Sequence, residues 1–186
     1  MGTGRIYTIG HSTRTIESFV GLLRVHGVLQ VLDVRTIPRS RTNPQFNEDE
    51  LRLSLPRHDI GYERLAALGG LRHPSKDSIN RAWRNASFRG YADYMQTDEF
   101  RDGIAELVGW AVTPVAVMCA EAVPWRCHRS LIGDALLVRG IEVYHIVSDS
   151  PAKRHELTRF AQVDGLRITY PPRADPPSEP GTSPAG

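Results

Sequence analysis

Short apolar runs alternate with helix-like segments, and this alternation most constrains how the chain can fold. Residues 6–10 form a β-prone run that ends in glycine, and residues 28–34 form a second apolar run of strand length. Between them, Thr15 predicts a helix start and Gly27 a helix stop. A strand, a helix and a strand within about 30 residues predict a βαβ unit, whose crossover is nearly always right-handed.

The alternation continues through the rest of the chain. The further predicted elements are strands at 115–119, 141–146 and 166–170 and helices at 91–110, 127–139 and 153–161. Strands that alternate with helices predict an α/β fold, a single-domain layered structure with a mostly parallel sheet flanked by helices. In such sheets, ligands bind beyond the carboxyl ends of the strands. Candidate functional residues are therefore expected at those ends.

The length of 186 residues fits one domain, since domains commonly run to roughly 100–200 residues. Residues 171–186 carry six of the 13 prolines and almost nothing apolar. We therefore expect a single α/β domain over residues 1–170 and a Pro-rich disordered tail over 171–186. Within the domain, residues 35–90 are irregular, and a long irregular segment in a compact domain is usually functional.

The composition excludes a membrane-spanning helix and favours the cytoplasm. No apolar run reaches the roughly 18 residues that a spanning helix needs. No signal peptide is visible at the N-terminus. Two cysteines without an export signal indicate a reducing compartment, where they serve as thiols or ligands. We therefore expect a cytoplasmic protein without a membrane partner.

The net charge of +2 hides an uneven distribution. Residues 35–90 hold 11 Arg and Lys residues against six Asp and Glu residues. Of the 23 basic residues in the chain, 21 are arginine. This excess has two interpretations. One is genomic base composition, and the other is anion recognition, because the planar guanidinium matches phosphate and carboxylate.

Chemically unusual residues follow three of the predicted strands. They are His11 and Ser12, Asp33 and Arg35, and a longer group of Cys119, Glu121, Cys127, His128, Arg129 and Ser130. If the sheet is parallel, all three groups converge on one edge. His11 is interpreted as a general base or ligand, or as a helix cap. Asp33 and Arg35 share a strand face, where they bind a polar substrate or pair with each other.

The third group suggests thiol or metal chemistry. Cys127 and His128 are predicted to open a helix, where the backbone amides and Arg129 favour an anion and a thiolate. The group fits a nucleophile beside an anion pocket. It also fits a zinc site formed by Cys119, Cys127 and a histidine. A third interpretation is that the cysteines are small buried hydrophobic residues.

The spacing excludes the familiar templates. Seven residues lie between the two cysteines, unlike the C-x-x-C pairs of zinc ribbons. Neither cysteine has an arginine six positions later, as the phosphatase signature requires. The deaminase motif and the Gly-rich phosphate loops are also absent.

Five motifs together resemble one known family. They are TIGHS at 8–12, DVR at 33–35 with Pro38 and Arg41, LGG at 68–70, MCAE at 118–121 and CHRS at 127–130. In their order, from about residue 5 to residue 147, they are similar to the domain-of-unknown-function family number 488, found mainly in bacteria and archaea. The resemblance implies a small single-domain α/β protein with the motif positions as its shared site. It implies no reaction.

The leading functional hypothesis is an enzyme, a hydrolase or transferase acting on a phosphate-bearing or nucleotide-like substrate. Its catalytic candidates are His11, Asp33, Cys119, Glu121 and Cys127. Its candidates for binding an anion are Ser12, Arg35, Arg41, His128, Arg129 and Ser130. A small anionic molecule or nucleotide is favoured over nucleic acid as the partner.

Two other hypotheses stay open. A nucleic-acid-binding or regulatory protein without turnover would use the basic segment 35–90, in which aromatic residues are interleaved. A metal or redox sensor would use Cys119 and Cys127 with His11 or His128. No motif requires a cofactor, and zinc or iron would suit those ligands. Nothing in the sequence indicates an oligomeric state.

Overall fold

A six-stranded sheet forms the centre of the molecule, in a computed structural model that describes residues 5–172. The strand order is β3-β2-β4-β1-β5-β6, with parallel pairing from β3 to β5 and an antiparallel β6. The strands are β1 (Arg5–Gly10), β2 (Gln30–Asp33), β3 (Gly61–Arg64), β4 (Val115–Cys119), β5 (Glu142–Ile146) and β6 (Lys153–Arg154). The helices are α1 (Ile16–Val25), α2 (Glu48–Ser54), α3 (Ala86–Tyr94), α4 (Asp98–Gly109) and α5 (Arg129–Leu137).

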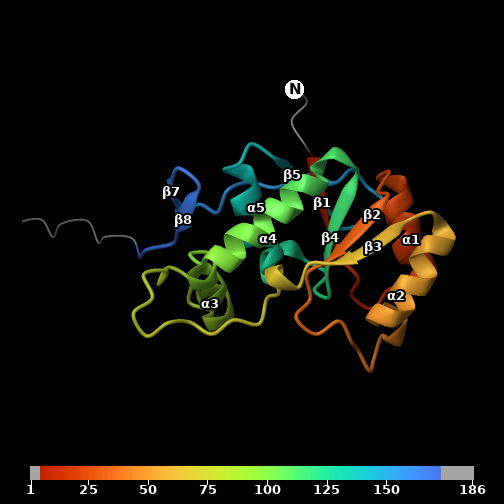
Figure 1. The fold of residues 1–186 in the computed structure, drawn as a ribbon, viewed down its shortest axis with the longest axis horizontal. Helices are drawn as coiled ribbons and strands as arrows, with labels where there is room; N and C mark the ends of the chain where they lie inside the picture. The colour runs from red at the N-terminus through yellow and green to blue at the C-terminus, as the bar shows by residue number, and fades with distance from the viewer. Residues whose placement is uncertain (1–4, 173–186) are drawn as a thin grey trace, which may run out of the picture.

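The helices cover both faces of the sheet, which confirms the predicted α/β layer fold. Figure 1 shows α1 and α2 on one side of the strands and α3, α4 and α5 on the other. Successive strand residues point to opposite faces, so Ile9 packs with the α1 and α2 side chains and Ile6 with those of α4 and α5. Each face therefore has its own hydrophobic cluster.

The strand order of the sheet reverses between β1 and β4. β1 leads through α1 to β2, and β4 leads through α5 to β5, on the opposite face. β1 and β4 are neighbours, yet their connections go toward opposite edges of the sheet. The crevice at their carboxyl ends is the position at which open α/β sheets bind ligands.

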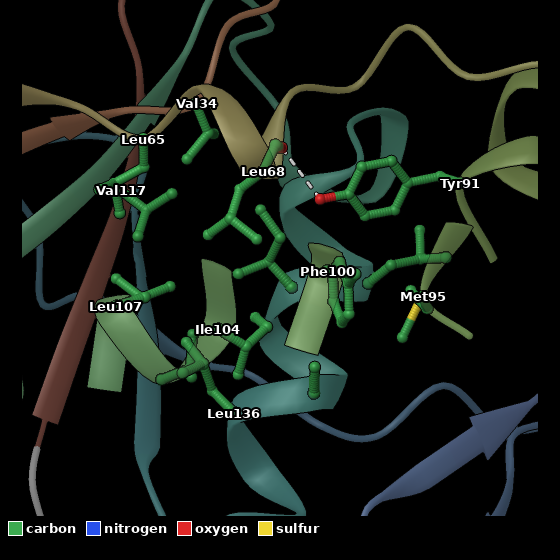
Figure 2. Close-up of a cluster of buried hydrophobic side chains, with 14 of the residues drawn as sticks. Val34, Leu65, Leu68, Tyr91, Met95, Phe100, Ile104, Leu107, Val117 and Leu136 are labelled. Atoms are coloured by element: carbon green, nitrogen blue, oxygen red, sulfur yellow. Dashed lines mark hydrogen bonds between the residues drawn. The ribbon is translucent and has the colours of Figure 1, made fainter. Parts of the chain in front are cut away.

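The cluster on the α4 and α5 side also supports the loop at this crevice. Figure 2 shows Leu68, at the end of the 3-10 turn Ala66–Leu68, among the side chains of this cluster. Tyr91 of α3 is fully buried, and its hydroxyl donates to the Leu68 carbonyl over 2.9 Å (Figure 2). This bond fixes the turn from which the chain enters Gly69 and Gly70.

Several predicted elements differ from the observed ones. The helix expected at 91–110 is two helices, because Thr97 caps α4 by accepting the Phe100 amide. The prediction of a helix at 153–161 is wrong. β6 pairs there with β5, and the His155 amide donates to the Val143 carbonyl. Its physical reason is the burial of His155, which holds the segment extended against the sheet.

The last expected strand, at 166–170, is not part of the main sheet. It forms β8 (Arg167–Thr169), which pairs only with β7 (Gln162–Asp164) in a separate hairpin, visible apart from the sheet in Figure 1. β3, an edge strand in the irregular segment 35–90, was not expected. No helix in the described part of the chain is long and apolar enough to cross a membrane. The predicted disordered tail at 171–186 lies almost wholly outside the described residues.

We expect Tyr91→Phe to lower the free energy of unfolding by about 1–3 kcal/mol, because it leaves the buried Leu68 carbonyl without its donor. Urea denaturation measures the change. Tyr144→Phe is the matched control: its hydroxyl is part-buried and 3.4 Å from Glu142, so we expect a change within about 0.5 kcal/mol. Equal effects of the two substitutions would contradict this role of Tyr91.

Candidate functional site

The backbones that leave β1 and β4 stay paired beyond the two strands. The His11 amide donates to the Cys119 carbonyl over 2.9 Å, and the Ser12 amide donates to the Ala120 carbonyl over 2.9 Å. Ser12 adopts a left-handed backbone conformation, with φ 51°, as the chain turns toward α1. The first and third groups of residues from the sequence therefore meet at one edge.

Glycine is required at the end of β1. A Cβ at Gly10 would lie 1.8 Å from the carbonyl oxygen of Glu121, so only glycine permits this approach. The same carbonyl accepts a hydrogen bond from Nη2 of Arg129. One backbone oxygen thus joins β1, the loop after β4 and the start of α5.

Asp33 and Arg35 form a buried ion pair. Nε and Nη2 of Arg35 donate to the carboxylate over 2.9 and 2.6 Å, and the Tyr62 hydroxyl donates over 2.7 Å. Nη2 also donates to the Phe46 carbonyl over 2.8 Å. Burial opposes the charge on Arg35, but its bonds to Asp33 outweigh this and raise the pKa of Arg35. Asp33 is fully buried and holds Arg35 at the edge of the sheet.

His11 lies beside this pair as a neutral ring. Its imidazole stacks on Phe46, with ring centroids 4.3 Å apart. Nδ1 is 2.8 Å from the Ser12 carbonyl, which can only accept, so Nδ1 carries the hydrogen. Nε2 is then free to accept from Nη1 of Arg35 over 3.3 Å. Burial lowers the pKa of His11 to about 4, so the ring is neutral at pH 7.

Two thiols and an imidazole form a cluster at the carboxyl end of β4. One ligand atom from each of Cys119, Cys127 and His128 lies within 4.8 Å of the other two. Sγ of Cys127 is 3.6 Å from Nδ1 of His128 and accepts from Nε of Arg129 over 3.3 Å. A hydrogen bond from the Cys119 thiol and the positive charge of Arg129 lower the pKa of Cys127 well below its usual value. These three residues could also hold a metal ion.

A buried chain of hydrogen bonds supports Arg129, which is 1% exposed. Nη1 of Arg129 donates to the Thr8 hydroxyl over 3.4 Å, and Thr8 is 2.7 Å from Nδ1 of His145. Nε2 of His145 is 2.9 Å from Nδ1 of His155, whose Nε2 is 2.9 Å from the Asp134 carboxylate. When His155 donates to Asp134 through Nε2 and accepts from His145 through Nδ1, every donor in this chain meets an acceptor. A cation at one end is thereby linked to an anion at the other.

The Asp134 carboxylate accepts hydrogen bonds from two further donors. The Tyr170 hydroxyl donates over 2.8 Å and the Thr158 amide over 3.0 Å. Burial lowers the pKa of His145 to about 3, which keeps its ring neutral within the chain. Residues after β6 therefore bind Asp134 in α5 and, through the chain of hydrogen bonds, support Arg129 at the start of this helix.

Two cavities open at this edge of the sheet. The first, of about 320 Å³, is lined by Arg35, Thr36, Ile37, Gly70, Leu71, Ser87, Phe88, Cys119, Ala120, Glu121, Arg126, Cys127 and His128. The second, of about 480 Å³, is lined by His11, Ser12, Thr13, Arg35, Ile37, Arg39, Ser40, Asn43, Ala120, Glu121 and Ala122. They share Arg35, Ile37, Ala120 and Glu121, so they form one cleft with two parts.

The structure brings most of the sequence-predicted site residues to this cleft. The exceptions are Arg41, which is exposed, and Asp33, Arg129 and Ser130, which are buried; none of the four lines either cavity. The Ser130 hydroxyl donates to the Cys127 carbonyl over 3.0 Å.

Sequence reasoning missed residues that line the cleft or support it. They are Arg39, Arg126, His145 and His155. Arg39 and Arg126 lie close to the motifs, and that proximity was a usable signal. The two histidines stand in no motif, and their role depends on contacts across the fold.

The fold and the cleft define a small α/β protein whose polar and thiol side chains gather at the carboxyl ends of parallel strands. Within that class, the chain belongs to the family described as Domain of unknown function DUF488, whose model matches residues 15–136. This confirms the resemblance that the motifs indicate. No curated protein and no solved structure matches the chain.

We expect the protein to lose stability as the pH falls from about 6.5 toward 4. His11 and His145 have pKa values of about 4 and 3 when folded, below the roughly 6.5 of an unfolded histidine. The unfolded chain then binds more protons over this range, so acid favours unfolding. Each ring contributes about 2 kcal/mol of this loss by pH 5, as about 1.4 kcal/mol per pH unit implies.

Urea denaturation at pH 7.5 and pH 5 measures this loss. His11→Asn keeps a donor near the position of Nδ1 but cannot titrate, so its pH dependence should be smaller by about 2 kcal/mol. A free energy of unfolding that is the same at both pH values would refute the expectation.

Proposed function

We propose that the protein is a cytoplasmic enzyme, a hydrolase or transferase, that acts on a phosphate-bearing, nucleotide-like substrate. One observation carries the proposal: an apolar cavity with two thiols shares a wall with a polar, basic cavity. Two free cysteines fit a reducing compartment. A substrate with both an apolar and an anionic part matches such a cleft.

The two cavities differ in the chemistry that they offer. Ile37, Leu71 and Phe88 give the first cavity an apolar wall suited to a planar base. The exposed guanidinium of Arg39 and the hydroxyl of Ser40 line the second, where they suit a phosphate group. The volumes of about 320 and 480 Å³ lie within the range of roughly 300–1,000 Å³ typical of small-molecule sites.

Glu121 is the proposed acid/base group. Glu121 is among the residues that line both cavities, the one with the thiols and the one with Arg39. Oε1 accepts from the Val123 amide over 3.3 Å, which orients the carboxylate. The exposed Arg126 lines the first cavity with the cluster, so negative charge that develops there meets a cation.

The buried residues have supporting roles in this proposal. Asp33 neutralises the charge of Arg35. Nη1 of Arg35 is left to donate a hydrogen bond to Nε2 of His11. Arg129 is too deeply buried to touch a substrate and instead donates to Cys127. A carboxylate, thiols and guanidinium groups are costly to gather for stability alone, which supports a functional reason for the cleft.

Binding by AMP, adenosine and inorganic phosphate tests the two-part cleft. We expect AMP to bind at least about tenfold more tightly than either of its parts, a difference of about 1.4 kcal/mol in calorimetric titrations. Arg39→Ala should weaken AMP binding by about the same factor and leave adenosine binding unchanged. Arg57→Ala, an exposed arginine outside both cavities, is the control.

Two outcomes would count against the proposal. Equal affinities for AMP and adenosine would remove the anion-binding part of the cleft. Steeply salt-dependent binding of a random single-stranded oligonucleotide, with no binding of AMP, would favour a nucleic-acid-binding protein without turnover.

Turnover of a panel of nucleotides and phosphomonoesters tests the reaction. Glu121→Gln should lower kcat by about 10²- to 10⁴-fold and leave KM within a few-fold, because it removes a proton-transfer group. Glu106→Gln, an exposed substitution on α4, should match the unsubstituted enzyme. If the unsubstituted protein turns over no member of the panel, the proposed reaction class is wrong.

A further inference from the structure

We infer that Cys119, Cys127 and His128 bind one zinc ion through their Sγ atoms and Nδ1. In a tetrahedral site with Zn–S of about 2.3 Å and Zn–N of about 2.0–2.1 Å, the ligand atoms are about 3.5–3.8 Å apart. Sγ of Cys127 is 3.6 Å from Nδ1 of His128, and the ligand atoms of all three residues lie within 4.8 Å of one another. Small movements of the side chains therefore suffice to enclose the ion.

The tautomer of His128 favours metal binding. Nε2 is 3.3 Å from the Val34 carbonyl, which can only accept, so Nε2 carries the hydrogen. The lone pair of the ring is then on Nδ1, on the side of Cys127. A backbone carbonyl that accepts from the far nitrogen is the usual outer partner of a metal-bound histidine.

Gly70 fixes the ring without blocking that lone pair. A Cβ at Gly70 would lie 2.3, 2.6 and 2.8 Å from Nδ1, Cε1 and Cγ of His128. A point 2.3 Å from Nδ1 in the ring plane, along the lone pair, would be about 3.3 Å from both carbons, given ring bonds of about 1.35 Å. Gly70 therefore lies over the ring face, and the in-plane direction toward the thiols stays open.

The charges around the cluster match a divalent cation held by two thiolates. Two thiolates neutralise Zn²⁺, and Nε of the buried Arg129 donates to Sγ of Cys127 as an outer partner. Zinc binds thiolates, so its binding releases the thiol protons. The complete site carries a net charge of +1 from Arg129 and attracts an anion.

The fourth position of the zinc ion faces the first cavity. All three ligands line that cavity of about 320 Å³, together with Glu121 and Arg126. Three protein ligands and one open position are typical of catalytic zinc sites, whereas structural sites are closed by four. In the part of the chain that the structure describes, no other group of three His, Cys, Asp or Glu ligands is placed this way.

Metal content and cobalt substitution test the site without any substrate. We expect the full chain, purified without chelator or affinity tag, to hold about one zinc ion. Co²⁺ added to the apoprotein should produce thiolate-to-cobalt charge-transfer absorption and the visible bands of a tetrahedral ion. Cys119→Ser, Cys127→Ser and His128→Gln should each lower the affinity by more than the 10- to 100-fold that loss of an outer partner costs.

Two further variants separate metal binding from folding. Gly70→Ala keeps all three ligands but displaces the His128 ring, and we expect it to weaken Co²⁺ binding at least about tenfold. His26→Gln changes a histidine outside the cleft and should bind as the unsubstituted chain does. The circular dichroism spectrum of each variant checks that the chain is folded.

The inference is overturned if the folded chain holds no zinc, shows no cobalt spectrum and has two freely titrating thiols. It is also overturned if cobalt binds equally to the His128→Gln and Gly70→Ala variants, since the ion then lies elsewhere. AMP binding to the same samples distinguishes the two proposals: AMP binding by a chain that takes no metal removes the zinc site and leaves the proposed substrate class intact.

Discussion

The approach of Gly10 to the carbonyl oxygen of Glu121 is the contact on which this edge of the sheet depends. A Cβ at this position would lie 1.8 Å from that oxygen, so a side chain would push the loop after β4 into the cleft. The same oxygen accepts from Arg129, which in turn donates to Cys127. The side chains of the candidate site are therefore positioned by contacts of the buried backbone.

Buried and exposed arginines differ in how their charges are balanced. Arg35 is buried against Asp33, and Arg129 is linked to Asp134 through a chain of hydrogen bonds. Buried charges without such partners would destabilise the fold by several kcal/mol each. Arg39, by contrast, is exposed in the cleft. The buried cations are thus neutralised inside the protein, whereas Arg39 has no ion-pair partner among residues 5–172 and lines the second cavity.

The sequence allowed most strands and the edge of the candidate site to be predicted, because buried parallel strands read as continuous apolar runs. β3, with the sequence GYER, was not predicted because an edge strand needs no continuous apolar run. The segment 153–161 was misassigned because its extended form depends on contacts of His155, which no local pattern reports. Geometry was needed to decide whether His11 or His128 joins the thiols, because the sequence offers both histidines as ligands. His145 meets Thr8 across 137 positions, a pairing that no motif encodes.

The central place of β1 has a consequence for the order of folding. Its residue Ile6 pairs with Val115, 109 positions later, and Arg5 pairs with Glu142. On the ribosome, this first strand emerges long before either of its neighbours exists, and only β2 and β3 can pair early. Such distant contacts make folding slow and leave apolar strand edges exposed during synthesis. The nascent chain is therefore expected to need protection by chaperones, and its cleft can form only after α5 has been made.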